Sequence, residues 1–323
     1  MKIYINRFAR TEAWGGGNHA IRAVQDSPLF EIVDNFTIAY DTINHQHIQW
    51  QGDRPDLILI MGIDEDVLGP KIDGPFKGFI FSFPKLEDLL HHNVKKVLRV
   101  NDCDARKGTT HVDLRLIEAS KYIDGTIFVS QWMYDYFMKK GWACPRNRCT
   151  VIHNGVDASI FHNRSKLNNG KINIVAHHWS DNPLKGFDIY EHIDEFVGHH
   201  DEFTFTYIGR DRSTFKNTQC LGVLFGEKLG EELGKRDIYV SASRFDPGPN
   251  HIAESIACGL PTYVHTNGGG CVEFADNDHV FHDWNELKHI LLNKKFSANS
   301  TSFGSWKMMT EQYKTFLDKI HAL

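Results

Sequence analysis

Short runs rich in β-branched and aromatic residues alternate along the chain with longer segments in which apolar residues recur three or four positions apart. This alternation is typical of parallel β-sheets flanked by helices, and it predicts an α/β fold. The runs that predict strands in the first half are Lys2–Phe8, Asp56–Gly62, Gly78–Phe83, Lys96–Asn101, Gly125–Ser130 and Thr150–His153. Those in the second half are Ile172–His177, Phe203–Gly209, Ile238–Ser243, Thr262–His265 and His279–His282. The helical segments between them include Ser130–Lys140, Gly186–Val197 and Glu227–Arg236, so both halves are predicted to be doubly wound.

A polar stretch without apolar periodicity, from Asn163 to Gly170, follows the turn signal Asn154-Gly155 and predicts a border between two domains. The last segment places its apolar residues on one helical stripe, which must pack on another surface: Trp306, Met309, Tyr313, Phe316 and Ile320. We therefore expect an N-terminal Rossmann-like domain over residues 1–160, a C-terminal one over residues 161–304 and a final helix over residues 305–323.

The length of 323 residues agrees with two domains of similar size. The 36 Lys and Arg against 41 Asp and Glu give a net charge of -5, which disfavours binding to a nucleic-acid backbone. No run approaches the roughly 18 to 20 apolar residues of a membrane span, and an early charged residue leaves no signal-peptide core. Because the six cysteines form no CxxC pair, we expect reduced thiols and a cytoplasmic protein.

Three basic spots could touch the inner face of an anionic membrane or an anionic acceptor, and solvated surfaces explain them equally well: Lys95-Lys96, Lys139-Lys140 and Arg146/Arg148.

The densest group of chemical signals runs from Ile238 to Pro261. It reads as a buried strand, a loop with two prolines, Asn250 as a possible helix cap, a short helix, and a Gly-Leu-Pro stop. The amino end of such a helix suits a phosphate, and Asp246 and Glu254 flank it. In the alternative interpretation, Asp246 makes a turn and Glu254 is a solvated helix residue.

Two further segments carry possible ligand contacts. Lys185 follows the strand ending at His177 and precedes a helix, so it is expected at the carboxyl edge of the sheet, where it could bind a phosphate or be a surface lysine. Gly15, Gly17 and Ala20 match the spacing of a dinucleotide fingerprint, but six residues separate Gly15 from the preceding strand. We interpret this glycine segment as a substrate-contacting loop. The histidine pairs show no zinc spacing, so no metal site is predicted.

Taken together, these motifs resemble the retaining glycosyltransferases of the GT-B fold, most closely glycosyltransferase family 4. The family's signature is an acidic residue, seven other residues, a Glu, a run of small residues and Gly-Leu-Pro. Asp246, Glu254 and Ala257-Cys258-Gly259-Leu260-Pro261 are similar to this signature, although its first acidic residue is usually Glu. Lys185-Gly186 is similar to the family's Lys-Gly before a helix. Ser180 stands where the family has an Arg about five residues earlier, which is a departure.

Three weaker motifs extend the resemblance over nearly the whole chain: Asn154-Gly155-Val156-Asp157 with Phe161 at the domain junction, Gly15-Gly16-Gly17 in the first loop, and Gly268-Gly269-Gly270 with Glu273 near the end. The resemblance implies a GT-B fold, in which two Rossmann-like domains face each other across a cleft and the final helix crosses back to the first domain. The N-terminal domain would hold the acceptor and the C-terminal domain the donor.

The resemblance also implies roles for single residues. Glu254 would hold the ribose hydroxyls, Lys185 the diphosphate, and Asp246 the donor sugar, and with Asp102 they form the predicted catalytic set. The predicted donor-binding residues are Gly16, Gly17, His178, Ser180, Lys185, Gly209, Arg210, Asp246, Gly248, Pro249, Asn250, His251 and Glu254. The predicted acceptor-side residues are Asn18, Arg99 and Asn101.

The function implied is transfer of a hexose from a UDP- or GDP-sugar to a hydroxyl of a glycan, lipid-linked or small-molecule acceptor, with retention and without metal or other cofactor. One alternative is a sugar-nucleotide epimerase on the same fold, and another is a non-catalytic nucleotide-sugar binding protein. A hydride-transferring oxidoreductase, suggested by the glycine spacing, leaves Lys185 and Asp246–Pro261 unexplained. Glycoside hydrolysis by two carboxylates is a further alternative, although the spacing does not fix their separation.

Overall fold

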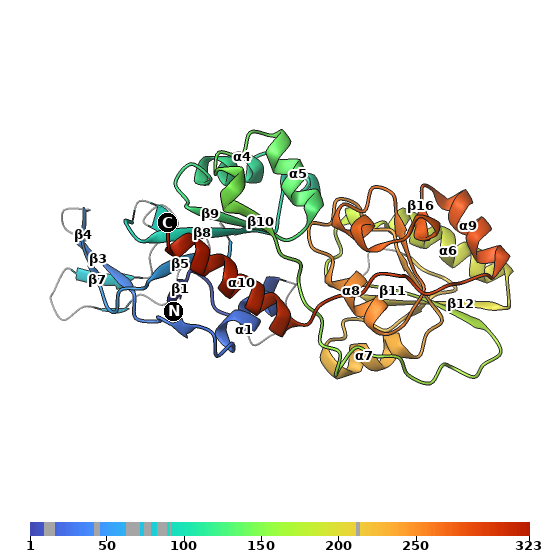
Figure 1. The fold of residues 1–323 in the computed structure, drawn as a ribbon. Coiled ribbons are helices and arrows are strands. Elements are labelled where there is room, and N and C mark those ends of the chain that lie inside the picture. Colours follow the sequence, from blue (N-terminus) through green and yellow to red (C-terminus); the bar gives the residue numbers. More distant parts are fainter. Residues whose placement is uncertain are drawn as a thin grey trace.

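The computed structural model describes residues 1–9, 17–41, 46–62, 72–73, 79–82, 89–90, 92–210 and 214–323. Two lobes lie side by side, one formed by the first half of the chain and one by the second half (Figure 1). Each lobe is built around a six-stranded sheet in which every pair of neighbouring strands is parallel. The predicted α/β class with two doubly wound domains is therefore confirmed.

The first sheet has the strand order β10-β9-β8-β5-β1-β2. Its strands are β1 (Lys2–Ile5), β2 (Glu31–Ile32), β5 (Leu57–Ile60), β8 (Lys95–Val100), β9 (Gly125–Phe128) and β10 (Cys149–Val151). The helices of this lobe include α1 (Gly17–Gln25), α3 (Asp104–Lys107), α4 (Val112–Ala119), α5 (Gln131–Lys139) and the short η1 (Arg146–Arg148). All four residues of β5 are buried, as expected for a central strand covered on both faces.

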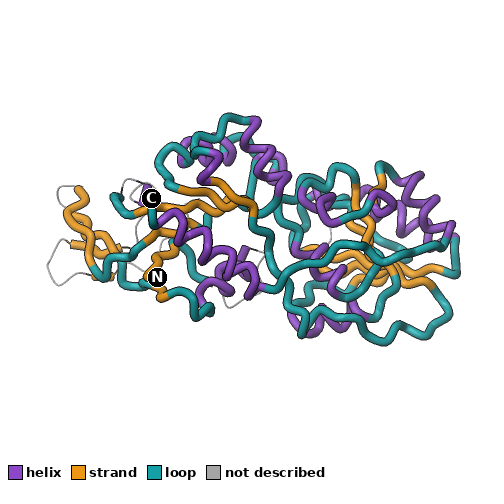
Figure 2. The backbone as a smooth tube through the Cα atoms, viewed as in Figure 1, coloured by secondary structure: helices purple, strands orange, loops and turns teal. Residues whose placement is uncertain are grey.

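A separate antiparallel sheet has the order β4-β3-β7-β6, with β3 (Thr37–Asp41), β4 (Gln46–Gln51), β6 (Ile72–Asp73) and β7 (Phe79–Ser82). It lies at the end of the first lobe that points away from the second lobe (Figure 2). The sequence prediction of a strand at Gly78–Phe83 found β7 but assigned it to the doubly wound sheet, which was wrong. β7 pairs antiparallel with β3 and β6, and antiparallel partners need no helical crossover.

The second sheet has the strand order β13-β12-β11-β14-β15-β16. Its strands are β11 (Ile172–His178), β12 (Phe203–Gly209), β13 (Gln219–Cys220), β14 (Ile238–Ser241), β15 (Thr262–His265) and β16 (Val280–Phe281). Its helices are α6 (Phe187–His199), α7 (Gly226–Gly234), α8 (Asn250–Ala257), α9 (Trp284–Asn293) and the short η2 (Pro183–Lys185), η3 (Gly270–Phe274) and η4 (Asn277–His279). The strand order reverses between β11 and β14, and in open α/β sheets ligands bind at the carboxyl ends of the strands at such a point.

The last helix, α10 (Trp306–His321), crosses back from the second lobe to the first (Figure 1). Its buried side chains share one apolar cluster with β1, β5 and β8 of the first sheet: Met309, Tyr313, Phe316, Leu317 and Ile320. The predicted apolar stripe thus packs on the N-terminal domain, as the resemblance implied. None of the described helices is long and apolar enough to span a bilayer.

Candidate functional site

A cavity of about 950 Å³ lies between the two lobes and takes its lining from both. The carboxyl ends of β11 and β14 open into it, so it coincides with the switch point of the second sheet. Lys185, Asn250 and Glu254, three of the predicted donor-binding residues, all line this cavity.

Lys185 and Asp246 form a buried ion pair on the wall of the cavity that the C-terminal domain provides, which we call the C-terminal wall. Lys185 Nζ donates to Asp246 Oδ2 at 2.8 Å and lies 3.4 Å from Ser243 Oγ. Burial lowers the pKa of Lys185, and Asp246 partly opposes this. Burial would raise the pKa of Asp246, but the positive charges of Lys185 and Arg106 help to hold it well below its usual value. Asp246 is therefore a carboxylate that compensates the charge of the lysine.

The turn before α6 fixes the position of Lys185. Asn182 Oδ1 accepts a hydrogen bond from the amide of Leu184 at 2.8 Å and caps η2. Gly186, which directly follows Lys185, has a φ of +87°, and a Cβ there would lie 2.2 Å from the carbonyl oxygen of Ala242. Only glycine allows this approach, which brings Lys185 beside the loop that carries Asp246.

The loop that carries Asp246 is held at several points. The amide of Phe245 donates to Asn267 O at 2.8 Å and that of Asp246 to Gly268 O at 3.1 Å. Phe245 has a φ of +55°, a conformation that costs free energy in a non-glycine residue and persists where the surrounding structure imposes it. Asn250 was predicted to cap the following helix, which was wrong. Pro249 is the N-cap residue, and the side chain of Asn250 instead contacts the other domain.

Two histidines at the end of β11 line the cavity. His177 Nε2 lies 2.7 Å from Glu254 Oε2, and His178 Nε2 lies 2.6 Å from the Tyr190 hydroxyl. Burial lowers the pKa of His178 far below its usual value, so this imidazole is neutral. Within the described residues, the Nδ1 atoms of both histidines are buried and have no hydrogen-bond partner. They are two polar atoms that a bound ligand could satisfy.

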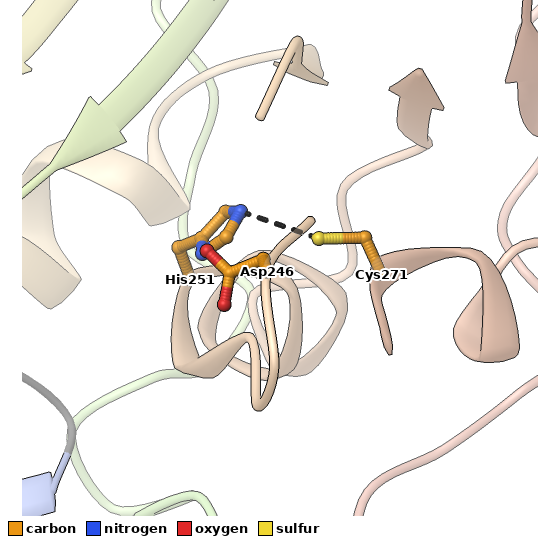
Figure 3. Close-up of side chains that lie close together, drawn as sticks. All are labelled: Asp246, His251 and Cys271. Atoms are coloured by element: carbon orange, nitrogen blue, oxygen red, sulfur yellow. Dashed lines mark hydrogen bonds and ion pairs between the residues drawn. The ribbon is translucent and has the colours of Figure 1, made fainter. Parts of the chain in front are cut away.

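Asp246, His251 and Cys271 lie close enough together to be considered as metal ligands (Figure 3). The geometry disfavours one shared ion, because Asp246 Oδ2 is 4.0 Å from His251 Nδ1 whereas Cys271 Sγ is 3.8 Å from His251 Nε2. The two candidate ligands thus approach different ring nitrogens. Lys185 already occupies Asp246 Oδ2, and burial raises the pKa of the Cys271 thiol. A cation would have to displace the ammonium and deprotonate a buried thiol.

A chain of hydrogen bonds between residues that line the cavity connects the two domains. Arg99 NH2 donates to Asn154 Oδ1 at 2.8 Å, and Asn154 Nδ2 donates to Asn250 Oδ1 at 2.7 Å. Arg99 Nε also donates to the Tyr313 hydroxyl of α10 at 3.0 Å. Arg99 is buried, and its NH1 has no hydrogen-bond partner among the residues that the structure describes. This predicted acceptor-side residue therefore connects the first sheet, the domain junction and α10.

The remaining predicted N-terminal residues lie at the carboxyl end of β8 and the start of α1. A Cβ on Gly17 would be 3.3 Å from Asn101 Nδ2, so the start of α1 touches Asn101. Asp102 Oδ2 forms an ion pair with Lys107 Nζ at 2.8 Å, and burial raises the pKa of Asp102 against the opposing charge of that lysine. Gly17, Asn18, Asn101 and Asp102 all line the cavity, whereas Gly16 lies outside the described residues.

Most of the predicted donor-binding residues line the same cavity: His178, Ser180, Lys185, Gly209, Asp246, Gly248, Asn250, His251 and Glu254. Two do not. Pro249 is buried at the start of α8, and the exposed Arg210 lies over the ring of Trp179 with 4.5 Å between its Cζ and the ring centre. Sequence reasoning missed His177, Asn154 and Arg106, which also line the cavity. The adjacent His177-His178 pair was visible, but no sequence pattern pairs His177 with Glu254.

No protein-family model matches the chain, and no curated protein matches it. Solved structures do match its fold. Anabaena Alr3699/HepE in complex with UDP and glucose has 14% identity and a TM-score of 0.68 over 98% of this chain and 99% of that chain. Sucrose-phosphate synthase (tll1590) from Thermosynechococcus elongatus has 12% identity and a TM-score of 0.67 over 99% of both chains. The pneumococcal O-GlcNAc transferase GtfA in complex with UDP and GlcNAc has 14% identity and a TM-score of 0.56 over 82% of this chain and 56% of that chain. These similarities confirm the predicted GT-B fold.

Proposed function

We propose that this protein is a glycosyltransferase that moves a sugar from a UDP-sugar to a hydroxyl acceptor in the cleft between its domains. One observation carries the proposal: Lys185, Asp246, His251 and Glu254 line one cavity at the switch point of the second sheet. Two proteins of similar fold are in complex with UDP and glucose and with UDP and GlcNAc, which supports a uridine nucleotide over other bases.

The donor nucleotide would lie on the C-terminal domain. Glu254 Oε2 is bound to His177, and Oε1 has no partner in the described part of the chain, so Oε1 is open to the ribose hydroxyls. Lys185 and the amino end of α8 would face the diphosphate, where the helix dipole favours negative charge. Asp246 would keep Lys185 charged and oriented.

The reaction we propose retains the configuration at the anomeric carbon and uses no metal, as in the family 4 enzymes that the sequence resembles. The acceptor oxygen forms a bond to the anomeric carbon while the bond from that carbon to the β-phosphate oxygen breaks. The acceptor's proton passes to the departing phosphate oxygen. Lys185 and the helix end stabilise the charge that develops on the leaving group. Arg99, Asn101 and Asp102 would line the acceptor side, which accommodates a glycan, a lipid-linked sugar or a small molecule.

A thermal-shift screen against UDP-, GDP-, ADP- and CMP-sugars tests donor binding, because a ligand at 100 times its dissociation constant stabilises a protein by about 2.7 kcal/mol. We expect stabilisation by a UDP-sugar. Glu254→Gln should weaken UDP binding in calorimetry, whereas Glu311→Gln on the outer face of α10 should not. Equal affinities in the wild type and Glu254→Gln would contradict the ribose role.

Turnover is tested with the donor found in that screen and a panel of hydroxyl acceptors, by the release of free UDP with and without EDTA. Lys185→Ala should reduce turnover roughly 10²- to 10³-fold. NMR of the product gives the anomeric configuration. Formation of an epimeric sugar nucleotide without acceptor would identify the epimerase alternative instead, and donor binding without any product would identify a binding protein.

A further inference from the structure

The C-terminal wall of the cavity carries little net positive charge for a diphosphate. The charge of Lys185 is compensated by Asp246 at 2.8 Å. Burial lowers the pKa of both His178 and His251 far below the usual value, so neither imidazole contributes a charge. Glu254 adds a carboxylate. A nucleoside diphosphate brings at least two negative charges, and a site of low dielectric needs opposing charges close to them.

The wall of the cavity that the N-terminal domain provides carries a cation without an ion-pair partner in the described part of the chain. Arg106 lies on α3, which follows β8 in the N-terminal domain, and it lines the same cavity as Lys185 and Asp246. Its side chain is half-buried, and its guanidinium makes no hydrogen bond or ion pair within the described part of the chain.

The other charged residues of α3 have partners. Lys107 is paired with Asp102 at 2.8 Å. Asp104 accepts hydrogen bonds from the amides of Val112 and Asp113 at the start of α4. Arg106 is therefore the charged side chain of this helix that remains available to a ligand.

The positive charge of Arg106 affects titratable side chains on the C-terminal wall. It contributes to lowering the pKa of Asp246 and of Lys185, and it acts on His178 and His251 of the same wall. It also acts on Asp102 of its own domain. Arg106 thus faces the group of side chains that we assign to the diphosphate.

We propose that the guanidinium of Arg106 is the second cationic ligand of the donor diphosphate and reaches it from the opposite domain. The inference rests on the proposed function. A planar guanidinium binds phosphate oxygens in a bidentate manner, and Lys185 supplies a point charge from the other side. The diphosphate then bridges the two walls, so that donor binding draws the domains together.

The C-terminal wall itself has a short polar residue in the segment that leads to Lys185. Ser180 lines the cavity, and its Oγ accepts a hydrogen bond from the amide of Asn182 at 3.1 Å. An arginine at position 180 would place a guanidinium on the C-terminal wall. This position therefore allows the charge of Arg106 to be moved from one domain to the other without a change in net charge.

The experiment is isothermal titration calorimetry with UDP and with UMP on the full-length protein. Arg106→Ala should raise the Kd of UDP by roughly tenfold to a hundredfold and that of UMP by less than about threefold, because a charge-assisted contact to the second phosphate is lost. The double variant Arg106→Ala/Ser180→Arg should recover about tenfold in UDP affinity. Lys121→Ala, which removes an exposed cation of the same domain paired with Glu118, is the matched control and should leave both affinities unchanged.

The outcomes separate the two proposals. Wild-type protein that binds neither UDP nor another nucleoside diphosphate overturns the proposed function. Wild-type protein that binds UDP while Arg106→Ala binds it equally well overturns only the role of Arg106. A loss that is equal for UDP and UMP, or that comes with a lowered melting temperature, contradicts a diphosphate ligand and indicates a structural role. A double variant as weak as Arg106→Ala contradicts charge as the cause.

Discussion

At the scale of single residues, the Lys185–Asp246 pair is the most strongly coupled feature of the site. Both side chains are almost fully buried, so removing one partner leaves an uncompensated charge. Lys185→Met or Asp246→Asn alone should lower the free energy of unfolding by about 3 to 5 kcal/mol. The double variant should lose clearly less than the sum, which urea denaturation of the four proteins measures. Additive losses would show that the two residues act independently.

The same pair predicts a dependence of stability on pH. The pKa of Asp246 lies well below its usual value in the folded protein, so the carboxylate favours the folded state. This contribution is complete above the unfolded pKa of about 3.9 and decreases as the pH falls below it. The difference in unfolding free energy between wild type and Asp246→Asn should therefore be constant from pH 7 to about pH 5 and shrink in more acidic buffer. A difference that grows on acidification would have the wrong sign for this carboxylate.

Gly209 was predicted to bind the donor. Its backbone conformation also requires glycine at this position, independently of any ligand. Its φ is +133°, and a Cβ would lie 1.9 Å from the carbonyl oxygen of His178. Gly209→Ala should thus cost about 3 kcal/mol or more of stability even without ligand. Gly170→Ala is the control, since Gly170 also has a positive φ of +70° but nothing within 4 Å of its missing Cβ, and it should cost about 1 kcal/mol. Thermal melts in the absence of nucleotide distinguish the two.

The sequence allowed prediction of residues that follow strands, and it missed residues whose importance comes from the other domain. Lys185 and Asp246 follow neighbouring parallel strands, so their meeting at one edge of the sheet could be expected. Asn154 was recognised only as part of a turn at the domain junction, and Arg106 was not singled out, because their places in the cleft depend on the other lobe. The assignment of Asn250 as a helix cap was wrong for the same reason, since its side chain contacts Asn154.

At the scale of elements, α5 of the first lobe begins against a carboxylate of the second. Glu273 in η3 accepts hydrogen bonds from the amides of Gln131 at 3.0 Å and Trp132 at 2.6 Å, and it lies 2.9 Å from His153 Nε2. A carboxylate at the amino end of a helix satisfies free amides and interacts favourably with the helix dipole. Glu273 therefore connects the second lobe to the amino end of α5 in the first lobe.

Replacing this carboxylate should loosen the contact between the lobes. We expect Glu273→Gln to lower stability by about 1 to 2 kcal/mol, because charge-assisted hydrogen bonds at a helix start are lost. Glu118→Gln removes a carboxylate from an exposed pair with Lys121 and should cost less than about 0.5 kcal/mol. Hydrogen exchange at the amides of Gln131 and Trp132 reports the contact directly. Unchanged protection in Glu273→Gln would contradict the proposed connection.

Elements with a strong apolar pattern were predictable, and a polar strand was not. The predicted strand Thr262–His265 has the observed bounds, and the helix predicted at Ser130–Lys140 is observed over Gln131–Lys139. β4 (Gln46–Gln51) has only two large apolar residues, Ile48 and Trp50, among polar neighbours, and it was missed. Such a strand depends on its partner β3 for its hydrogen bonds, which no local pattern encodes.

At the scale of the whole molecule, α10, the Arg99–Asn154–Asn250 chain and the contact of Glu273 with α5 join two lobes that face each other across the cavity. A ligand gripped by Lys185 on one wall and Arg106 on the other should draw the lobes together and exclude water from the reacting bond. A compact body of this length has a radius of gyration of about 20 Å, and an open two-lobed molecule has a larger one.

Small-angle X-ray scattering should show the radius of gyration falling toward that value when saturating UDP is added to the wild type. Arg106→Ala, saturated with UDP at a correspondingly higher concentration, should keep the radius of the free protein, because its nucleotide is held by one wall only. If the variant contracts as the wild type does, domain closure does not depend on this arginine.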